Sequence, residues 1–350
     1  MLTRRSQRLG GAVLVLALLA AIAPIATDGG QGEPAAAKPF VRATLRLTDR
    51  ETTSLDQGRA VVKTFPDDLK REVTTAGAIR IKGSSARFVE QYRTLEGFRR
   101  SSFVLQIAKF SDPPQLADLD TLAMEADDRN ALRECQVGDC GLRLSAADIE
   151  RLRTQVNWQA SDADTQAEAL FKRILMDHLE AYRSGGIQRL PVYDDETTPV
   201  RLADEIKELL QQEPSPMDAA PALRGHLLSF PNGPLPKTEH FFYWSKEAFG
   251  FQPVIGLNHV TIHSTDTNRV FIVTTQVYAS HYMDGQTAVT ALLPEGGTPE
   301  HFYWLYFNRA RIDRLTGFLG SISRPIVQRR ARSGLARTLA DTKRRLEAQP

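Results

Sequence analysis

The stretch from Phe241 to Leu346 places the strongest limits on the fold of this chain. Five segments in or beside it are rich in β-branched and aromatic residues, which suit a pleated, half-buried surface. They are Glu239–Trp244, Val254–Ser264, Val270–Tyr282, Gln286–Leu293 and His301–Ile312. Short polar links join them, and one link is the tight-turn dipeptide Asp284-Gly285. Consecutive strands with short connections predict an antiparallel meander.

A long basic helix is expected after these strands. Ser323 can cap it, Pro325 suits its first turn, and about 22 residues would make it ~33 Å long. Its apolar side would hold Ile326, Val327, Ala331, Leu335, Leu339 and Leu346, and its basic side Arg329, Arg330, Arg332, Arg337, Lys343, Arg344 and Arg345. Gly334 lies in the middle of this helix and costs roughly 1 kcal/mol relative to alanine. It either allows close approach to the sheet or a ligand, or is simply tolerated.

The residues before this stretch predict an α+β fold with a helical insertion at about 112–235. Strands are expected at Glu72–Ile81 and Ser102–Phe110, with a helix over Ala86–Tyr92 between them, capped by Ser84 or Ser85. Val41–Leu47 reads as a strand or the start of a helix, and Ser54–Thr64 as helical. Four helices are expected in the insertion, at Ala146–Gln155, Asp162–Ser184, Val200–Gln212 and Leu223–Phe230.

The N-terminus predicts export. Arg4, Arg5 and Arg8 precede the uncharged run Leu9–Ala26, which is the layout of a secretory signal. The run is also long enough to be considered as an uncleaved membrane anchor. We therefore expect residues 1–26 to be a signal peptide or an N-terminal transmembrane helix, residues 27–39 to be a linker, and the domain to be periplasmic or anchored on the outer side of the membrane.

The two cysteines, Cys135 and Cys140, are expected to form a disulfide, because an exported chain with one close pair favours it. Four residues separate them, whereas a redox pair usually has two between its cysteines. Gly141 stands where a haem attachment needs histidine, and no further zinc ligands are close.

The charge of the chain is unevenly distributed, although the formal net charge is only +2. The segment 112–164 is rich in acids and the segment 309–345 is strongly basic. This asymmetry points either to orientation on an anionic membrane surface, through Arg329, Arg330 and Arg337, or to attraction between two parts of the chain. Nucleic acid is not expected as a partner, because an exported protein rarely meets it.

Two stretches resemble START-like (helix-grip, Bet v 1-like) domains. The sequence AGAIRIKG from Ala76, followed by a helix from Ser85 that carries Phe88 and Val89, resembles the first strand and helix of that fold. The C-terminal strands and long helix resemble its end. The chain also resembles a family of exported bacterial proteins without an assigned activity, through its CxxGxC, YWSKE and YASHY motifs. The START-like resemblance implies one domain over residues 40–348, with a cavity for a lipid or other apolar molecule between the sheet and the long helix.

Aromatic and imidazole side chains of the predicted strands are the candidates for lining such a cavity, although ordinary core packing would explain them as well. The candidates are Tyr243, Trp244, His259, Tyr278, His281 and Tyr303. An alternative is a cell-envelope enzyme with a polar cluster of His259, His263, His281, Tyr243 and Lys246, and a third is a membrane-tethered scaffold.

No catalytic residue, cofactor or metal is assigned from the sequence. It contains no Gly-x-Ser-x-Gly elbow, phosphate-binding loop or dinucleotide fingerprint. His259 and His263 would stand roughly 13 Å apart in a strand, which is too far for one metal ion.

Overall fold

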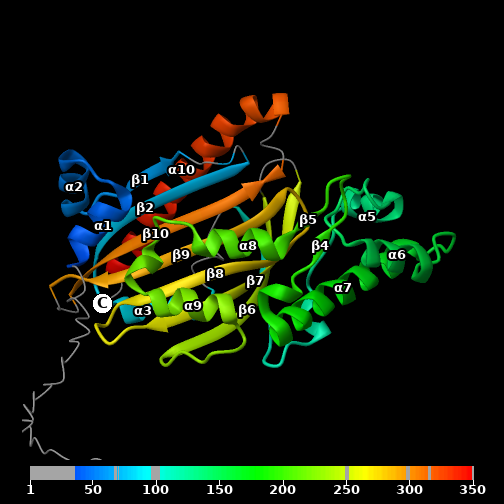
Figure 1. The fold of residues 1–350 in the computed structure, drawn as a ribbon, viewed down its shortest axis with the longest axis horizontal. Coiled ribbons are helices and arrows are strands. Elements are labelled where there is room, and N and C mark those ends of the chain that lie inside the picture. Colours follow the sequence, from blue (N-terminus) through cyan, green and yellow to red (C-terminus); the bar gives the residue numbers. More distant parts are fainter. Residues whose placement is uncertain are drawn as a thin grey trace, which may run out of the picture. The chain divides into compact units, whose positions relative to one another are not determined.

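In the computed structural model, an antiparallel sheet of eight strands forms the centre of the structure (Figure 1). The order across the sheet is β1-β2-β10-β9-β8-β7-β6-β3. The strands are β1 (Val61–Phe65), β2 (Glu72–Lys82), β3 (Val104–Lys109), β6 (Thr238–Ala248), β7 (Pro253–Ser264), β8 (Val270–Ala279), β9 (Met283–Pro294) and β10 (His301–Ile312). The described residues are 36–66, 69, 71–95, 103–248, 252–296, 300–313 and 317–348, with the backbone alone for 317–323.

Strands from the two ends of the domain lie side by side in this sheet. β10 pairs with β2 from His301 to Arg311, with Trp304 opposite Ile79 and Tyr306 opposite Gly77. The strands β6 to β10 form the expected antiparallel meander. The α+β class, the antiparallel sheet and the long C-terminal helix are as predicted.

Side chains alternate between the two faces of the sheet, and each face carries its own hydrophobic cluster. One face, called here the insertion face, holds Tyr303 of β10 and is covered by the helices α7 (Ala163–Gly185), α8 (Leu202–Gln211) and α9 (Pro221–Ser229). The other, the α10 face, holds Trp304 and is covered by α3 (Ser85–Arg93) and α10 (Gly317–Ala348). Figure 1 shows these two groups of helices on opposite sides of the sheet.

The segment between β3 and β6 forms the predicted helical insertion. It contains α5 (Ala126–Glu134), α6 (Ala146–Gln155), α7, α8, α9 and the two-residue strands β4 (Val192–Tyr193) and β5 (Val200–Arg201). Cys135 and Cys140 form the expected disulfide directly after α5. Ser145 caps α6 as predicted, because its hydroxyl accepts a hydrogen bond from the amide of Asp148.

The N-terminal part differs from prediction in two places. The chain forms α1 (Ala37–Leu45) and α2 (Asp49–Asp56) before β1, so the last residues of the expected linker are helical. The helix expected over Ser54–Thr64 is wrong. Gly58 has a φ of 71° after α2, and the β-branched pair Val61-Val62 continues as strand β1.

The turn expected at Asp284-Gly285 is also wrong, because both residues lie inside β9. Tyr282, with a φ of 58°, lies in the link between β8 and β9 instead. Asp284 is accommodated in the strand because its carboxylate pairs with Arg71 and Arg143, each at 2.7–2.8 Å.

The C-terminal helix starts earlier than expected. α10 runs over 32 residues from Gly317, so Ser323 is not its cap and Pro325 lies inside it. Leu335, Leu339 and Leu346 are buried against the sheet as predicted. Ile326 was expected on the same side but is 51% exposed, because the close packing of α10 on the sheet begins further along the helix.

The expected signal peptide or anchor, residues 1–26, lies outside the described residues. Within the part of the chain that the structure describes, no helix is long and apolar enough to cross a bilayer.

Candidate functional site

The six candidate ligand residues do not share one site, because they lie on both faces of the sheet. Tyr243 is the one on the α10 face. Trp244, Tyr278 and Tyr303 belong to the core beneath the insertion, where Trp244 Nε1 donates to the carbonyl of Asp118 at 2.8 Å. The Tyr278 hydroxyl donates to the carbonyl of Arg143 at 2.9 Å and that of Tyr303 to Glu295 at 2.9 Å. Trp244, Tyr278 and Tyr303 therefore do not lie on the face that α10 covers.

The polar cluster expected for an enzyme is likewise separated. His281 bonds to Asp128 at 2.9 Å, and His263 to the Thr238 hydroxyl at 2.9 Å. Lys246 lies under the insertion, where it contacts the carbonyl of Ala123 at 2.7 Å and Glu125 at 2.6 Å. Each side chain has its own partner, so the enzyme hypothesis loses the cluster on which it depended.

A different polar group converges on the α10 face. It consists of Tyr92 from α3, Tyr243 and Glu247 from β6, and Tyr306 from β10. Three strands separate β6 from β10, which would be roughly 19 Å along a flat sheet at ~4.8 Å per strand. The phenol of Tyr243 nevertheless interacts electrostatically with those of Tyr92 and Tyr306 and with Glu247. These side chains therefore lean toward one another on the α10 face.

These groups are desolvated. Burial raises the pKa of Tyr92 to about 12, and burial with the neighbouring Tyr92 and Glu247 raises the pKa of Tyr306. Burial also raises the pKa of the Glu247 carboxyl, against the opposing effect of the Ser245 hydroxyl, which donates to it at 2.7 Å. A desolvated carboxyl group beside three phenols is an arrangement typical of ligand sites.

The same groups keep some accessible surface. Tyr92, Glu247 and Tyr306 are only half-buried, although their surroundings raise their pKa values by desolvation. These side chains are therefore desolvated without being fully covered by the described residues. The Tyr306 hydroxyl has no protein hydrogen-bond partner among the described residues. Within the same part of the chain, the buried Trp304 Nε1 and Thr75 Oγ1 also lack one.

The helix α10 contacts both ends of the strand order. Leu339 lies over Gly77 of β2, near one end of the sheet. Gly334 lies beside the ring of Phe103, directly before β3 at the other end. These two positions are about 7.5 Å apart along the helix axis. Both ends of the sheet therefore meet α10, and the polar group lies on the strands between.

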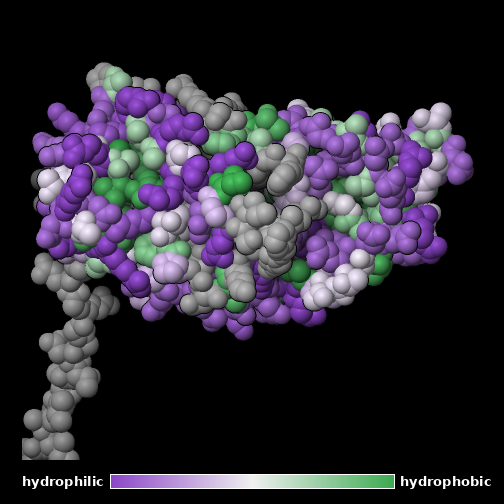
Figure 2. Space-filling view, turned by 90° about the horizontal axis from the view of Figure 1, so that it is seen from above, coloured by the Kyte–Doolittle hydropathy of each residue, from purple (hydrophilic) through white to green (hydrophobic). Residues whose placement is uncertain are grey.

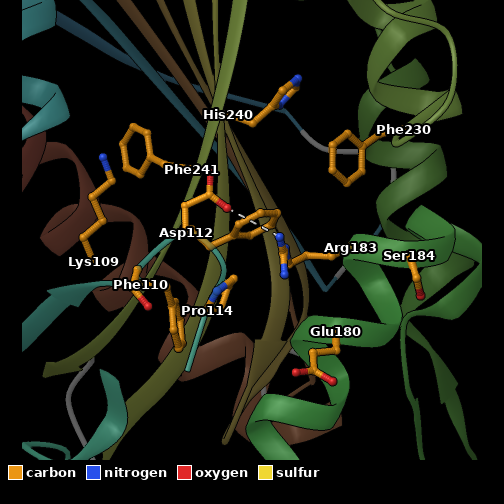
Figure 3. A pocket seen from close by; sticks show the side chains of 12 residues that line it. Lys109, Phe110, Asp112, Pro114, Glu180, Arg183, Ser184, Phe230, His240 and Phe241 are labelled. Carbon is orange, nitrogen blue, oxygen red and sulfur yellow. Dashed lines mark ion pairs between the residues drawn. The ribbon is translucent and has the colours of Figure 1, made fainter. Parts of the chain in front are cut away.

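A second site is a groove of about 600 Å³ beside α7, β3 and β6 (Figure 3). Its cationic groups have partners: Arg183 pairs with Asp112 at 3.6 Å, and Lys109 Nζ lies 4.3 Å from the centre of the Phe241 ring. Glu180 also lines the groove. Figure 3 shows His240 at the wall of this groove, with Phe230 nearby.

His240 is the middle member of a chain of three histidines. His226 Nδ1 lies 2.7 Å from the carbonyl of Gly233, and its Nε2 lies 3.1 Å from His240 Nε2. His240 Nδ1 lies 2.9 Å from His259 Nε2, and His259 Nδ1 lies 2.9 Å from the Tyr182 hydroxyl. Because a carbonyl can only accept, His226 must donate through Nδ1, so with neutral rings His240 donates to His226 and accepts from His259.

The surroundings of His240 and His259 also favour neutral imidazole rings. Burial lowers the pKa of His240 to about 4, and burial and His240 together lower the pKa of His259 well below its usual value. Among the described residues, no group of three or more histidines, cysteines or acids is arranged to hold a metal ion. The histidine chain therefore links α7, α9, β6 and β7 by hydrogen bonds.

Sequence reasoning did not select Tyr92 or Tyr306, and for Glu247 it favoured a surface ion pair over a place in a pocket. Tyr306 and Glu247 alternate with residues of the other face, as any strand residues do, and nothing local distinguishes the α10 face. A signal was present in the aromatic strand His301–Ile312, where Trp304 and Tyr306 share a face that Tyr303 does not.

No protein-family model matches this sequence, and no curated protein matches it significantly.

Proposed function

We propose that this chain is an exported, non-enzymatic START-like domain that binds a lipid or similar apolar ligand between the α10 face, α3 and α10. The observation that carries the proposal is the desolvated polar group of Tyr92, Tyr243, Glu247 and Tyr306 on the α10 face, of which all but Tyr243 keep accessible surface. Apolar residues surround this polar group, including Phe88, Ile262, Ile272 and Trp304. An apolar lining with a few convergent polar groups is typical of small-molecule sites.

The topology supports the START-like resemblance. Strand β2 is followed by helix α3, and the last strand β10 is followed by α10, in the order that the resemblance implies. β10 lies beside β2, so α10 leaves the last strand and packs on β2. The insertion covers the opposite face of the sheet, which leaves the α10 face to the two helices.

Export is inferred from the signal-like residues 1–26 and is supported by the disulfide between Cys135 and Cys140. Disulfides persist in oxidising compartments and are rare in reducing ones.

The surface of α10 supports contact with an anionic membrane. Arg329, Arg330 and Arg337 are exposed, and no acid pairs with them among the described residues. Arg329 also lines a groove of about 640 Å³ between α10 and β1, together with Val62. In the view of Figure 2, hydrophilic side chains cover most of the described surface and apolar ones form small patches, so such contact would be mainly electrostatic.

The ligand proposal is tested on the purified full chain by native mass spectrometry and by analysis of its organic extract. We expect an apolar species bound to the wild-type protein. Ala288 lies on the α10 face opposite Asn308. Ala288→Trp should therefore fill part of the proposed binding site and lower the fraction of protein that carries the ligand about fivefold or more. Ala126→Trp, at an exposed position of α5, is the matched control. Equal occupancy in both variants, or no binding by the wild-type protein, would contradict the proposal.

A further inference from the structure

We propose that the groove between α10 and β1 binds one molecule of an anionic phospholipid, with the phosphate between Arg329 and Arg332 and part of an acyl chain on the apolar floor of the groove. The proposal rests on the membrane contact proposed above and names its lipid class. It does not depend on the ligand proposed for the α10 face, because the groove lies at the edge of the sheet.

The groove follows the first part of α10, which does not pack closely on the sheet. In the described range 324–334 no side chain of the helix is fully buried, whereas Leu335 and Leu339 directly beyond it are buried. The opposite wall belongs to the edge strand β1 and the residue before it. The volume of about 640 Å³ is within the usual range of small-molecule sites.

Apolar side chains form the floor of the groove. Ala60 and Val62 contribute from the side of β1, and Pro325 and Ala336 from α10. Ala60 and Val62 also pack against the hydrophobic cluster of the α10 face, so the floor continues that core outward. Pro325 and Ala336 stand ~16 Å apart along the helix axis, which leaves room for an apolar chain beside a headgroup.

Two cations face the same groove without an anionic partner. Arg329 and Arg332 line it, and neither pairs with an acid in the part of the chain that the structure describes. Residues three apart on a helix have Cβ atoms about 5–6 Å apart, so both guanidinium groups can reach one phosphate. The guanidinium group matches the oxygens of a phosphate with two parallel hydrogen bonds. The lining therefore fits an anion that is joined to an apolar chain.

The shape of the groove favours a lipid over an acidic peptide. The residues on the side of β1 are Ala60, Val62 and Thr64, which alternate along the chain and therefore point to one face of the sheet. The groove thus presents side chains, whereas an extended peptide that adds to a sheet needs the backbone of its edge. Ile326, beside Pro325, is 51% exposed and offers an apolar contact to a bilayer at the same part of the helix.

The test compares three soluble probes: dihexanoyl phosphatidylglycerol, dihexanoyl phosphatidylcholine and glycerol phosphate. The two lipids carry the same chains and differ in net charge, and glycerol phosphate has the anion without the chains. Binding to the full chain is measured by titration calorimetry, with both lipids kept below the concentration at which they form micelles. We expect phosphatidylglycerol to bind about tenfold or more tightly than either of the other probes.

Two variants with matched controls test the walls of the groove. Arg332→Gln should weaken phosphatidylglycerol about tenfold, whereas Arg330→Gln, an exposed neighbour that does not line the groove, should change it less than about twofold. Ala336→Trp should fill the groove and also weaken binding about tenfold. Thr338→Trp, at an exposed position of α10 outside the groove, should leave the affinity unchanged.

Each contrary result has its own meaning. Equal losses in Arg332→Gln and Arg330→Gln would overturn the groove site and leave a contact through surface charge alone. Glycerol phosphate binding as tight as phosphatidylglycerol would overturn it in favour of a free phosphate. Displacement of phosphatidylglycerol by a glutamate-rich peptide that binds more tightly would overturn it in favour of an acidic protein. Absence of phosphatidylglycerol binding would overturn the groove site if anionic liposomes still bind, and would contradict the membrane contact itself if they do not.

Discussion

Leu339 of α10 lies directly over Gly77 of β2. A Cβ atom on Gly77 would stand 2.9 Å from Leu339 Cδ1 and 2.9 Å from the carbonyl oxygen of Val61. Real Cβ atoms do not approach backbone atoms so closely, so the sheet and helix meet at a point where only glycine fits. This contact joins α10 to one end of the sheet.

Gly77→Ala should therefore destabilise the protein. The added methyl group must displace the strand β1 or the helix α10, and overpacking of this kind costs about 1–3 kcal/mol. We expect a lower free energy of unfolding in denaturant titration. Gly334→Ala is the control, because its Cβ would stand 3.5 Å from the nearest Phe103 atom, an ordinary contact. That change should be neutral or stabilise by about 0.5–1 kcal/mol, and equal losses in both variants would refute the contact.

Arg143 is expected to hold the insertion on the sheet. Its guanidinium lies 2.7 Å from both Asp284 and Asp313, and its side chain is only 2% exposed. Arg143→Met should lower the free energy of unfolding by up to about 3–5 kcal/mol, because it takes this cation from the half-buried Asp313 and leaves the buried Asp284 with Arg71 alone. Arg153→Met removes an exposed pair with Glu150 and should cost less than about 1 kcal/mol. Similar losses in the two variants would argue against the buried pair.

Removal of the disulfide should loosen the loop that carries Asp195. The amides of Gly138 and Cys140 donate to the carbonyls of Asp194 and Asp195 at 2.7 and 3.0 Å. Replacement of Cys135 and Cys140 by serine should lower the free energy of unfolding by ~2 kcal/mol in the chain-entropy estimate. A reducing agent should have the same effect on the wild-type protein and none on the variant. Insensitivity of the wild-type protein would show that the bond contributes nothing to stability.

Stability should decrease as the pH falls from about 6.5 toward 4. The pKa of His240 is lowered from 6.5 to about 4 in the folded protein, and that of His259 is lowered well below 6.5. The unfolded chain therefore binds more protons in this range, so the free energy of unfolding is greatest above pH 6.5 and is lost on acidification. His259, which is fully buried, carries more of this effect than the more exposed His240.

His259→Phe should reduce this pH dependence, measured by denaturant titration across the range. His301→Gln, at the start of β10 and outside the histidine chain, is the control and should leave it in place. An unchanged dependence in His259→Phe would exclude His259 as its source.

Replacement of Arg329, Arg330 and Arg337 by glutamine should weaken binding to liposomes that contain anionic lipid. Each cation near an anionic surface contributes about 1 kcal/mol, so the combined loss should be a hundredfold or more in the partition constant, on the order of 3 kcal/mol. The wild-type affinity should fall with added salt, since these charges are exposed. Glutamine at Arg153, on the insertion, is the control. Equal binding by all three proteins would remove the membrane contact.

The sequence by itself determined the local elements of this protein. The β-branched runs specified the strands β6 to β10, Ser84 and Ser145 specified the starts of α3 and α6, and the one close cysteine pair specified the disulfide. These features depend on neighbouring residues, whose spacing and chemistry can be read along the chain. The errors also have local causes. Local patterns predict a helix start at Pro325 and a turn at Asp284-Gly285, whereas Pro325 lies inside α10 and Asp284 pairs with Arg71 and Arg143, which are distant in sequence.

Only the tertiary structure decided which helices cover the face of the sheet on which each side chain lies. Side chains alternate between the two faces along a strand, which places Tyr303 and Tyr306 on opposite faces. This alternation does not say which face α10 covers. The electrostatic interaction of Tyr306 with Glu247 across three strands, and the hydrogen bonds that join His226, His240 and His259, depend on segments that meet only on folding. Contacts between distant residues leave no periodic pattern in a single sequence. A site on one face of the sheet could therefore be expected from the sequence, but the residues that form it could not.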